Sequence, residues 1–161
     1  MDAIDMLKKQ HREVAAMFKK LGQARSGDER QEIFDDIADA LALHAAIEER
    51  SFYRSVLRNE TKGILRESVE EHLQMKRVIA DLLDLDPEDA VFMAKAKVLQ
   101  DDVEHHVEEE EETLFPEVRK LLDEQALETL GEAMEELASQ LKAEGNPRES
   151  VQGETEHAAP L

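Results

Sequence analysis

The chain has 161 residues, no cysteine and a formal net charge of −19 at pH 7. This length is enough for one domain with its own hydrophobic core. The lack of cysteine excludes disulfides, thiolate catalysis, cysteine-ligated zinc and iron–sulfur clusters held by cysteine. The negative charge argues against nucleic acid and against an anionic membrane surface as partners, because phosphate groups are bound by clustered Lys and Arg.

The composition favours an all-α protein, with 37% charged residues and only 4% aromatic residues. Good helix formers dominate, and the residues that favour strands are scarce. No stretch approaches the roughly 20 apolar residues needed to span a bilayer. The acidic first residues lack the basic-then-apolar pattern of a secretory signal, so we expect a cytoplasmic protein.

Apolar residues recur at helical spacing along most of the chain. The spacing predicts five helices, over residues 2–22, 28–58, 63–84, 87–122 and 123–143. Asp28 and Asp86 are the expected N-caps of the second and fourth helices, with Pro87 in the first position of the fourth. Pro116 is expected to bend or interrupt that helix, because proline lacks an amide donor.

The first four helices are long and joined by short connections, which is typical of an up-down-up-down four-helix bundle. We expect this bundle over residues 1–122, an additional C-terminal helix over 123–143 and a disordered tail over 144–161. The tail has few large apolar residues, which is why we expect it to be disordered. The apolar face of the fifth helix can either close the bundle or form a homodimer, so the sequence leaves monomer and homodimer open.

Four histidines stand out because each lies on the apolar stripe of a different main helix: His11, His44, His72 and His106. A single histidine on such a stripe is more often a core residue than a ligand. Four on four stripes are hard to explain as independent events, and they favour a shared metal site.

Two segments of the chain carry the same pattern and align without a gap. His44 falls on His106 and Glu48 falls on Glu110, so each segment contains His-x-x-x-Glu. Residues four apart stack on one helical face, and here that face is the buried one. A buried carboxylate without a partner is disfavoured by several kcal/mol, a penalty that a bound cation removes.

The repeat therefore predicts a pseudo-symmetric site for two metal ions. We expect four terminal histidine ligands and two bridging carboxylates: His11, His44, His72, His106, Glu48 and Glu110. Such a ligand set suits iron or manganese, and zinc also binds it. A bridged pair with open positions suits dioxygen, peroxide or nitric oxide as the small ligand.

The chain resembles the hemerythrin HHE cation-binding family. The motifs that carry the resemblance lie within residues 1–122 and are Gln10-His11-Arg12, His44 with Glu48-Glu49, Glu71-His72, and His106 with Glu110-Glu111 and Leu114-Phe115-Pro116. The resemblance implies a four-helix bundle around a non-haem di-iron centre with an oxo or hydroxo bridge. It also implies oxygen binding or sensing, iron handling, or a response to oxidative stress from peroxide and to nitric oxide.

The chain departs from the oxygen-carrying members of that family. They have a second histidine on the third helix, four residues from the first, whereas here Ser68 and Lys76 flank His72 at that spacing. Their fourth helix carries Asp where this chain carries Glu110. The vacant ligand position could hold water, an exogenous ligand, Glu49 or Glu111, which favours a more open and reactive or sensing site.

The leading hypothesis is thus a di-iron protein that binds or senses dioxygen, peroxide or nitric oxide, or handles iron. One alternative is a di-iron enzyme that removes peroxide or nitric oxide, and another is a metal-dependent regulatory or interaction module. A helical bundle with core histidines and no metal is the simplest reading. Outside the proposed ligands, we interpret His105 as peripheral, Tyr53 as a core residue and His157 as part of the tail.

Overall fold

The computed structural model covers residues 1–161 and contains helices but no strands. Its elements are α1 (Ala3–Gln23), α2 (Gly27–Ile47), η1 (Glu48–Phe52), α3 (Tyr53–Val56), α4 (Lys62–Leu83), α5 (Ala90–Glu109), η2 (Glu110–Leu114), α6 (Phe115–Leu121), α7 (Glu124–Ala143) and η3 (Pro147–Glu154). The segments η1 and η2 are π-helical turns, so α2-η1-α3 and α5-η2-α6 each form one continuous helix. The five predicted helices are therefore all present.

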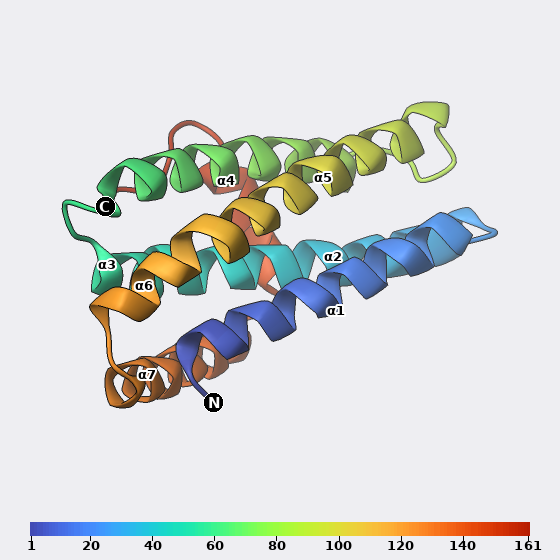
Figure 1. Cartoon of the computed structure of the whole chain (residues 1–161). Helices are drawn as coiled ribbons and strands as arrows, with labels where there is room; N and C mark the ends of the chain where they lie inside the picture. The colour runs from blue at the N-terminus through green and yellow to red at the C-terminus, as the bar shows by residue number, and fades with distance from the viewer.

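The four long helices run antiparallel to their neighbours in sequence and form the predicted bundle, with α7 lying along one end of it (Figure 1). α7 packs against α1 and α2. Gly131 on α7 faces the backbone of Met1 and Ala3, where a Cβ atom would collide with the Met1 carbonyl oxygen. Glycine at this position therefore permits the close approach of α7 to the start of α1. No helix has both the length and the apolar character needed to cross a membrane.

The hydrophobic core consists of two clusters, one toward each end of the bundle. Along α1, for example, Ile4 and Leu7 belong to the first cluster, and Val14 and Phe18 belong to the second. His11 falls between these two pairs. The other three stripe histidines occupy the same place on their helices, so a polar layer lies between two apolar layers.

Two helix starts differ from the sequence-based expectation. Ser26, not Asp28, is the N-cap of α2, and its hydroxyl accepts a hydrogen bond from the Glu29 amide at 3.1 Å. Asp89, not Asp86, caps α5 by accepting from the Val91 amide at 2.8 Å. In both places two candidate capping residues lie within three positions of each other, and spacing alone does not choose between them.

The C-terminal segment also differs from the expectation of a disordered tail. Residues 147–154 form the 3-10 helix η3, which packs against α2 and α4 (Figure 1, red). Val151 is only 1% exposed and belongs to the second core cluster. Arg148 is paired with Asp39 on α2, with 2.6 Å between guanidinium and carboxylate. One buried valine and a few polar contacts hold this segment. A single apolar residue forms no periodic pattern, so the sequence does not predict that the segment packs on the bundle.

Candidate metal centre

The two carboxylates predicted as bridges occupy equivalent places in the structure. Glu48 is the first residue of η1, and Glu110 is the first residue of η2. Short π-helical turns inside α-helices are frequent at functional sites. Here each one begins at the glutamate of a His-x-x-x-Glu pair, so the two halves of the repeat share the same local distortion.

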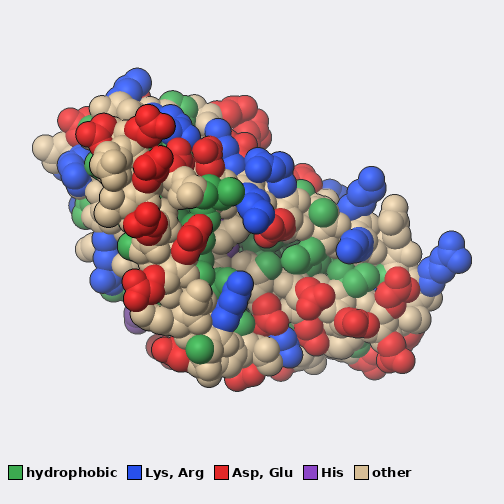
Figure 2. Space-filling model, turned by 90° about the horizontal axis from the view of Figure 1, so that it is seen from below, with side chains coloured by type: hydrophobic (Ala, Val, Ile, Leu, Met, Phe, Trp, Pro, Cys, Tyr) green, Lys and Arg blue, Asp and Glu red, His purple; other side chains and the backbone are tan.

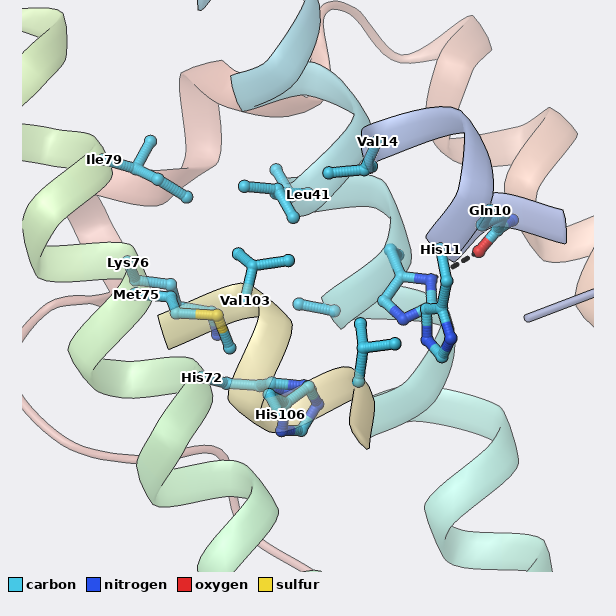
Figure 3. Close-up of a pocket in the computed structure, with 14 residues that line it drawn as sticks. Gln10, His11, Val14, Leu41, His72, Met75, Lys76, Ile79, Val103 and His106 are labelled. Atoms are coloured by element: carbon cyan, nitrogen blue, oxygen red, sulfur yellow. Dashed lines mark hydrogen bonds between the residues drawn. The ribbon is translucent and has the colours of Figure 1, made fainter. Parts of the chain in front are cut away.

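The six predicted ligands come together as two groups of three. Site A consists of His11, His44 and Glu110, and site B consists of Glu48, His72 and His106. Within each group the candidate ligand atoms lie within 4.8 Å of one another. All six residues are buried, with exposures between 0% and 8%. Figure 3 shows His11 on one side of a central cavity and His72 with His106 on the other.

Glu48 lies between the two sites. Its Oε1 atom is 3.1 Å from His44 Nε2 in site A and 3.2 Å from His72 Nε2 in site B. Glu110 does the same from the opposite helix, with Oε1 3.2 Å from His11 Nε2 and 3.4 Å from His106 Nε2. Each carboxylate therefore reaches histidines of both sites, as a bridging ligand requires.

The four histidines are all oriented by a hydrogen bond from Nδ1, the ring nitrogen away from the centre. Their acceptors are Glu111 for His11 (2.9 Å), Gln10 for His44 (2.6 Å), Glu49 for His72 (2.8 Å) and Glu71 for His106 (2.9 Å). A proton on Nδ1 leaves the Nε2 lone pair free. Metal-binding histidines are held in this way, with the second nitrogen donating to a carboxylate, carbonyl or amide.

The inward-facing atoms fit a bound cation. Five of them are fully buried and have no hydrogen-bond partner: His11 Nε2, His44 Nε2, both carboxylate oxygens of Glu48 and Glu110 Oε1. Buried polar atoms without a partner are rare and unfavourable. In site B, the Nε2 atoms of His72 and His106 lie 3.1 Å apart. Since both rings donate from Nδ1, their Nε2 lone pairs face and repel each other. A proton or a metal cation between the two nitrogen atoms would remove this repulsion.

The pKa values of the buried carboxylates and histidines also reflect the negative charge that is concentrated at the centre. Burial raises the pKa of Glu110, and the neighbouring Glu48 carboxylate raises it further. Burial also acts to raise the pKa of Glu48, but the nearby charge of His44 and the close approach of the other histidine side chains outweigh it, so this pKa is well below its usual value. Burial acts to lower the pKa of His106, but the charges of Glu110 and Glu48 and the hydrogen bond to Glu71 outweigh it and raise this pKa well above 6.5. The pKa values of His11 and His72 are raised as well, by their contacts with the carboxylates, so the metal-free cluster favours the protonated form of these rings.

Tyr53 lies in the core as predicted, but its hydroxyl group also reaches the candidate centre. Its hydroxyl donates to Glu110 Oε2 at 3.0 Å and lies 3.3 Å from His72 Nε2. An α-helix turns about 100° per residue, which would place a residue nine positions after His44 on the far side. The π-turn η1 accommodates one additional residue, and this rotates Tyr53 inward. A π-turn cannot be read from apolar spacing, so the only available signal was the alignment of Tyr53 with Phe115.

Phe115 occupies the equivalent place in the other half, stacked near His11 with ring centroids 6.0 Å apart. Tyr53 stacks on His72 with a centroid distance of 5.6 Å. The two halves thus share geometry but not chemistry, because only Tyr53 brings a hydroxyl into the centre.

The other residues considered in the sequence analysis do not belong to site A or site B. Glu49 and Glu111, considered for the vacant ligand position, instead accept hydrogen bonds on the outer side of His72 and His11. Lys76, which follows His72 by four residues, binds Glu49 at 3.0 Å. His105 has a 66% exposed side chain and lies 3.6 Å from Glu71. His157 is exposed in the C-terminal segment.

A cavity of about 30 Å³ adjoins the histidines. Aliphatic side chains from all four bundle helices line it, including Val14, Leu41, Met75 and Val103 (Figure 3). A single water occupies roughly 10–15 Å³ by this measure of volume. The space therefore suits a molecule of two or three heavy atoms in mainly apolar surroundings.

Comparisons with known proteins agree with this picture. Residues 2–118 match the family described as the hemerythrin HHE cation binding domain. A crystal structure of a hemerythrin HHE cation binding domain-containing protein from Mycobacterium kansasii has the same fold. Its TM-score is 0.80 at 22% identity, over 96% of this chain and 94% of that one. A DNA nickase from Nostoc sp. is 30% identical over 143 residues, which is 89% of this chain but only 39% of that protein.

Proposed function

The chain belongs to the hemerythrin HHE cation-binding domain family, and from this premise we propose that it is a non-haem di-iron protein that binds or senses dioxygen, peroxide or nitric oxide. The observation that carries the proposal is the set of five buried ligand atoms without hydrogen-bond partners, at the meeting point of two matched half-sites. Histidine and carboxylate ligands suit iron, with manganese or zinc as other possible occupants.

In this proposal each site holds one ion. His11 and His44 would bind the first, His72 and His106 would bind the second, and the carboxylates of Glu48 and Glu110 would bridge them. An oxo or hydroxo bridge between the ions belongs to the same proposal. Two such ions supply redox electrons and open coordination positions for a small ligand. The chain's own contribution is to hold four imidazoles in one tautomer and to surround the small ligand with a mainly apolar cavity.

The experiment that tests the proposal is a measurement of metal content and visible spectrum on protein purified without added metal. We expect about two irons per chain, on the ligand chemistry above, and a spectrum that responds to air, peroxide or nitric oxide. Glu48→Ala and Glu110→Ala should both fall well below that iron content. Glu108→Ala is the matched control, because Glu108 is an exposed residue of the same glutamate run. Unchanged iron in the first two variants would contradict the bridging assignment.

A second candidate is an enzyme that removes peroxide or nitric oxide, and the placement of Tyr53 favours it. A phenol hydroxyl 3.0 Å from Glu110 Oε2 offers a proton and an oxidisable ring next to the centre, on one side only. Oxygen release from peroxide, or consumption of nitric oxide, by the iron-loaded protein would support this function. Loss of that turnover in Tyr53→Phe with retained iron would tie it to the hydroxyl.

A regulatory or interaction module is the third candidate, since this chain spans about two fifths of the length of the DNA nickase to which it is similar. In that relative the similar region accompanies other sequence. We do not propose DNA nicking for this chain, because a net charge of −19 disfavours phosphate binding. On the face shown in Figure 2, Lys and Arg are interspersed with Asp and Glu. Binding of a duplex at low salt would refute this expectation.

A further inference from the structure

Lys76 is a buried cation that the centre described above leaves unexplained. It lies on α4, one turn beyond His72, and is 7% exposed. Buried lysines are rare unless they are paired. Its ammonium group contacts two carboxylates, Glu49 on η1 and Glu154 on η3, at distances of 3.0 and 3.1 Å.

Glu49 joins this lysine to the centre. The Oε2 atom of Glu49 accepts hydrogen bonds from His72 Nδ1 at 2.8 Å and from Lys76 Nζ at 3.1 Å. Burial acts to raise the pKa of Glu49, but the hydrogen bond and charge of His72, together with Lys76, outweigh it and lower that pKa. Glu49 is therefore a carboxylate shared between a candidate ligand and a fixed positive charge.

The C-terminal segment holds the other side of the lysine. Glu154 is the last residue of η3, and its side chain is 41% exposed. Anchors other than Glu154 keep η3 in place, including Arg148 on Asp39 and Gln152 on Asp84. Replacement of Glu154 by glutamine therefore removes one negative charge beside Lys76 and leaves the segment attached.

The other three histidines have no comparable connection. His11 and His106 donate to Glu111 and Glu71, neither of which is paired with Lys or Arg. His44 donates to the neutral amide of Gln10. Only the acceptor of His72 is fixed by a lysine, and only this lysine contacts a segment that lies outside residues 2–118, the part that matches the family.

We propose that Lys76 is a positioning residue for site B, and that η3 belongs to the metal centre through it. Glu154 holds the ammonium group in place, the ammonium group fixes the Glu49 carboxylate, and the carboxylate sets the orientation and electron donation of His72. The proposal rests on the proposed function insofar as site B binds a metal ion. It predicts that a change at Glu154, three contacts away from His72, alters the metal affinity of site B and leaves that of site A unchanged.

The test uses four variants of the full chain. Glu154→Gln removes the outer charge, Lys76→Met removes the ammonium group, and Lys76→Arg restores a cation. Glu156→Gln is the matched control, because it removes the same charge two residues away and no ion pair involves the Glu156 side chain. In metal-free protein, nitrogen-15 NMR of the imidazoles reports the tautomer and hydrogen bonding of each histidine. In a cobalt titration, two binding steps report the two sites.

We expect Lys76→Met and Glu154→Gln to shift the His72 nitrogen signals and leave those of His11 and His44 in place. We also expect these variants to weaken one cobalt step by up to about tenfold, the lower end of the effect of losing a histidine's own acceptor, because Glu49 stays in place but is held less firmly. Lys76→Arg should restore both readouts. Unchanged His72 signals in both variants, or equal weakening of both cobalt steps, would overturn the proposal. If the wild-type protein binds no cobalt, the proposed function fails, and the His72 signals still decide the positioning role. If Lys76→Met does not fold, Glu154→Gln decides alone.

Discussion

Glu71 offers the sharpest test of how the outer hydrogen bonds support the centre. Its Oε1 atom accepts from His106 Nδ1 at 2.9 Å, and the Glu71 side chain is 19% exposed. In Glu71→Ala the Nδ1–H of His106 loses its acceptor, and the ring is free to rotate or to change tautomer. Loss of such a partner lowers metal affinity by about 10- to 100-fold. This corresponds to roughly 1.4–2.8 kcal/mol, since each tenfold change is worth about 1.4 kcal/mol.

Glu71→Gln separates orientation from charge. A glutamine oxygen can still accept from His106 Nδ1, as Gln10 does for His44. We therefore expect this variant to lose less than about tenfold in affinity, on the same scale. The assay is competition between the protein and a coloured chelator for cobalt or zinc, which avoids oxidation of the metal during the titration. Glu70→Ala is the control, because Glu70 is an exposed neighbour on the same helix. If Glu71→Ala folds and binds metal as tightly as Glu70→Ala, His106 does not depend on this bond and the reasoning is refuted.

Three further predictions follow from packing, pH and the tyrosine. Gly131→Ala should destabilise the protein by about 1–3 kcal/mol, as overpacking does, because the new Cβ meets the Met1 carbonyl; chemical unfolding measures this, and a stability equal to wild type would refute the close packing. Metal-free protein should lose stability as pH rises above about 6.5, the ordinary pKa of histidine. The folded-state pKa values of His11, His72 and His106 lie above 6.5, so their contribution is complete below that pH and is lost on deprotonation. Unfolding free energies that do not fall over this range would contradict it. Tyr53→Phe should lower the stability of metal-free protein by about 1–3 kcal/mol, because Glu110 Oε2 loses its donor; an unchanged melting temperature would count against that bond.

The sequence predicted the bundle and the residues of the candidate centre because both depend on helical periodicity. His11 and His72 could be singled out because a histidine on an apolar stripe is conspicuous at a spacing of three or four residues. The pairing of each histidine with an acceptor could not be predicted, since Glu49, Glu71 and Glu111 are three among 39 acidic residues. Their roles depend on which helix lies opposite, and spacing along one helix does not give that information.

The features that the sequence does not predict also have physical causes. Tyr53 lies in the first core cluster, as predicted. The contact of its hydroxyl with Glu110 cannot be predicted, because regular helical spacing does not reveal the π-turn at Glu48. The C-terminal segment was expected to be disordered because its apolar content is low. A single buried valine, Val151, and the ion pair of Arg148 with Asp39 are enough to hold it, because α2 and α4 already provide the surface on which it lies.

The buried centre also connects metal binding to folding. The five ligand atoms without hydrogen-bond partners are buried between two apolar clusters. Buried polar atoms of this kind oppose folding, so in the metal-free state they offset part of the stability that the clusters supply. A metal that binds the folded state alone adds to this balance according to its concentration relative to its Kd. Removal of metal by a chelator should therefore lower the melting temperature, by about 2–4 °C for each kcal/mol in a chain of this length. Identical melting curves before and after chelation, in protein shown to have carried metal, would mean that the centre is as stable without its ions as with them.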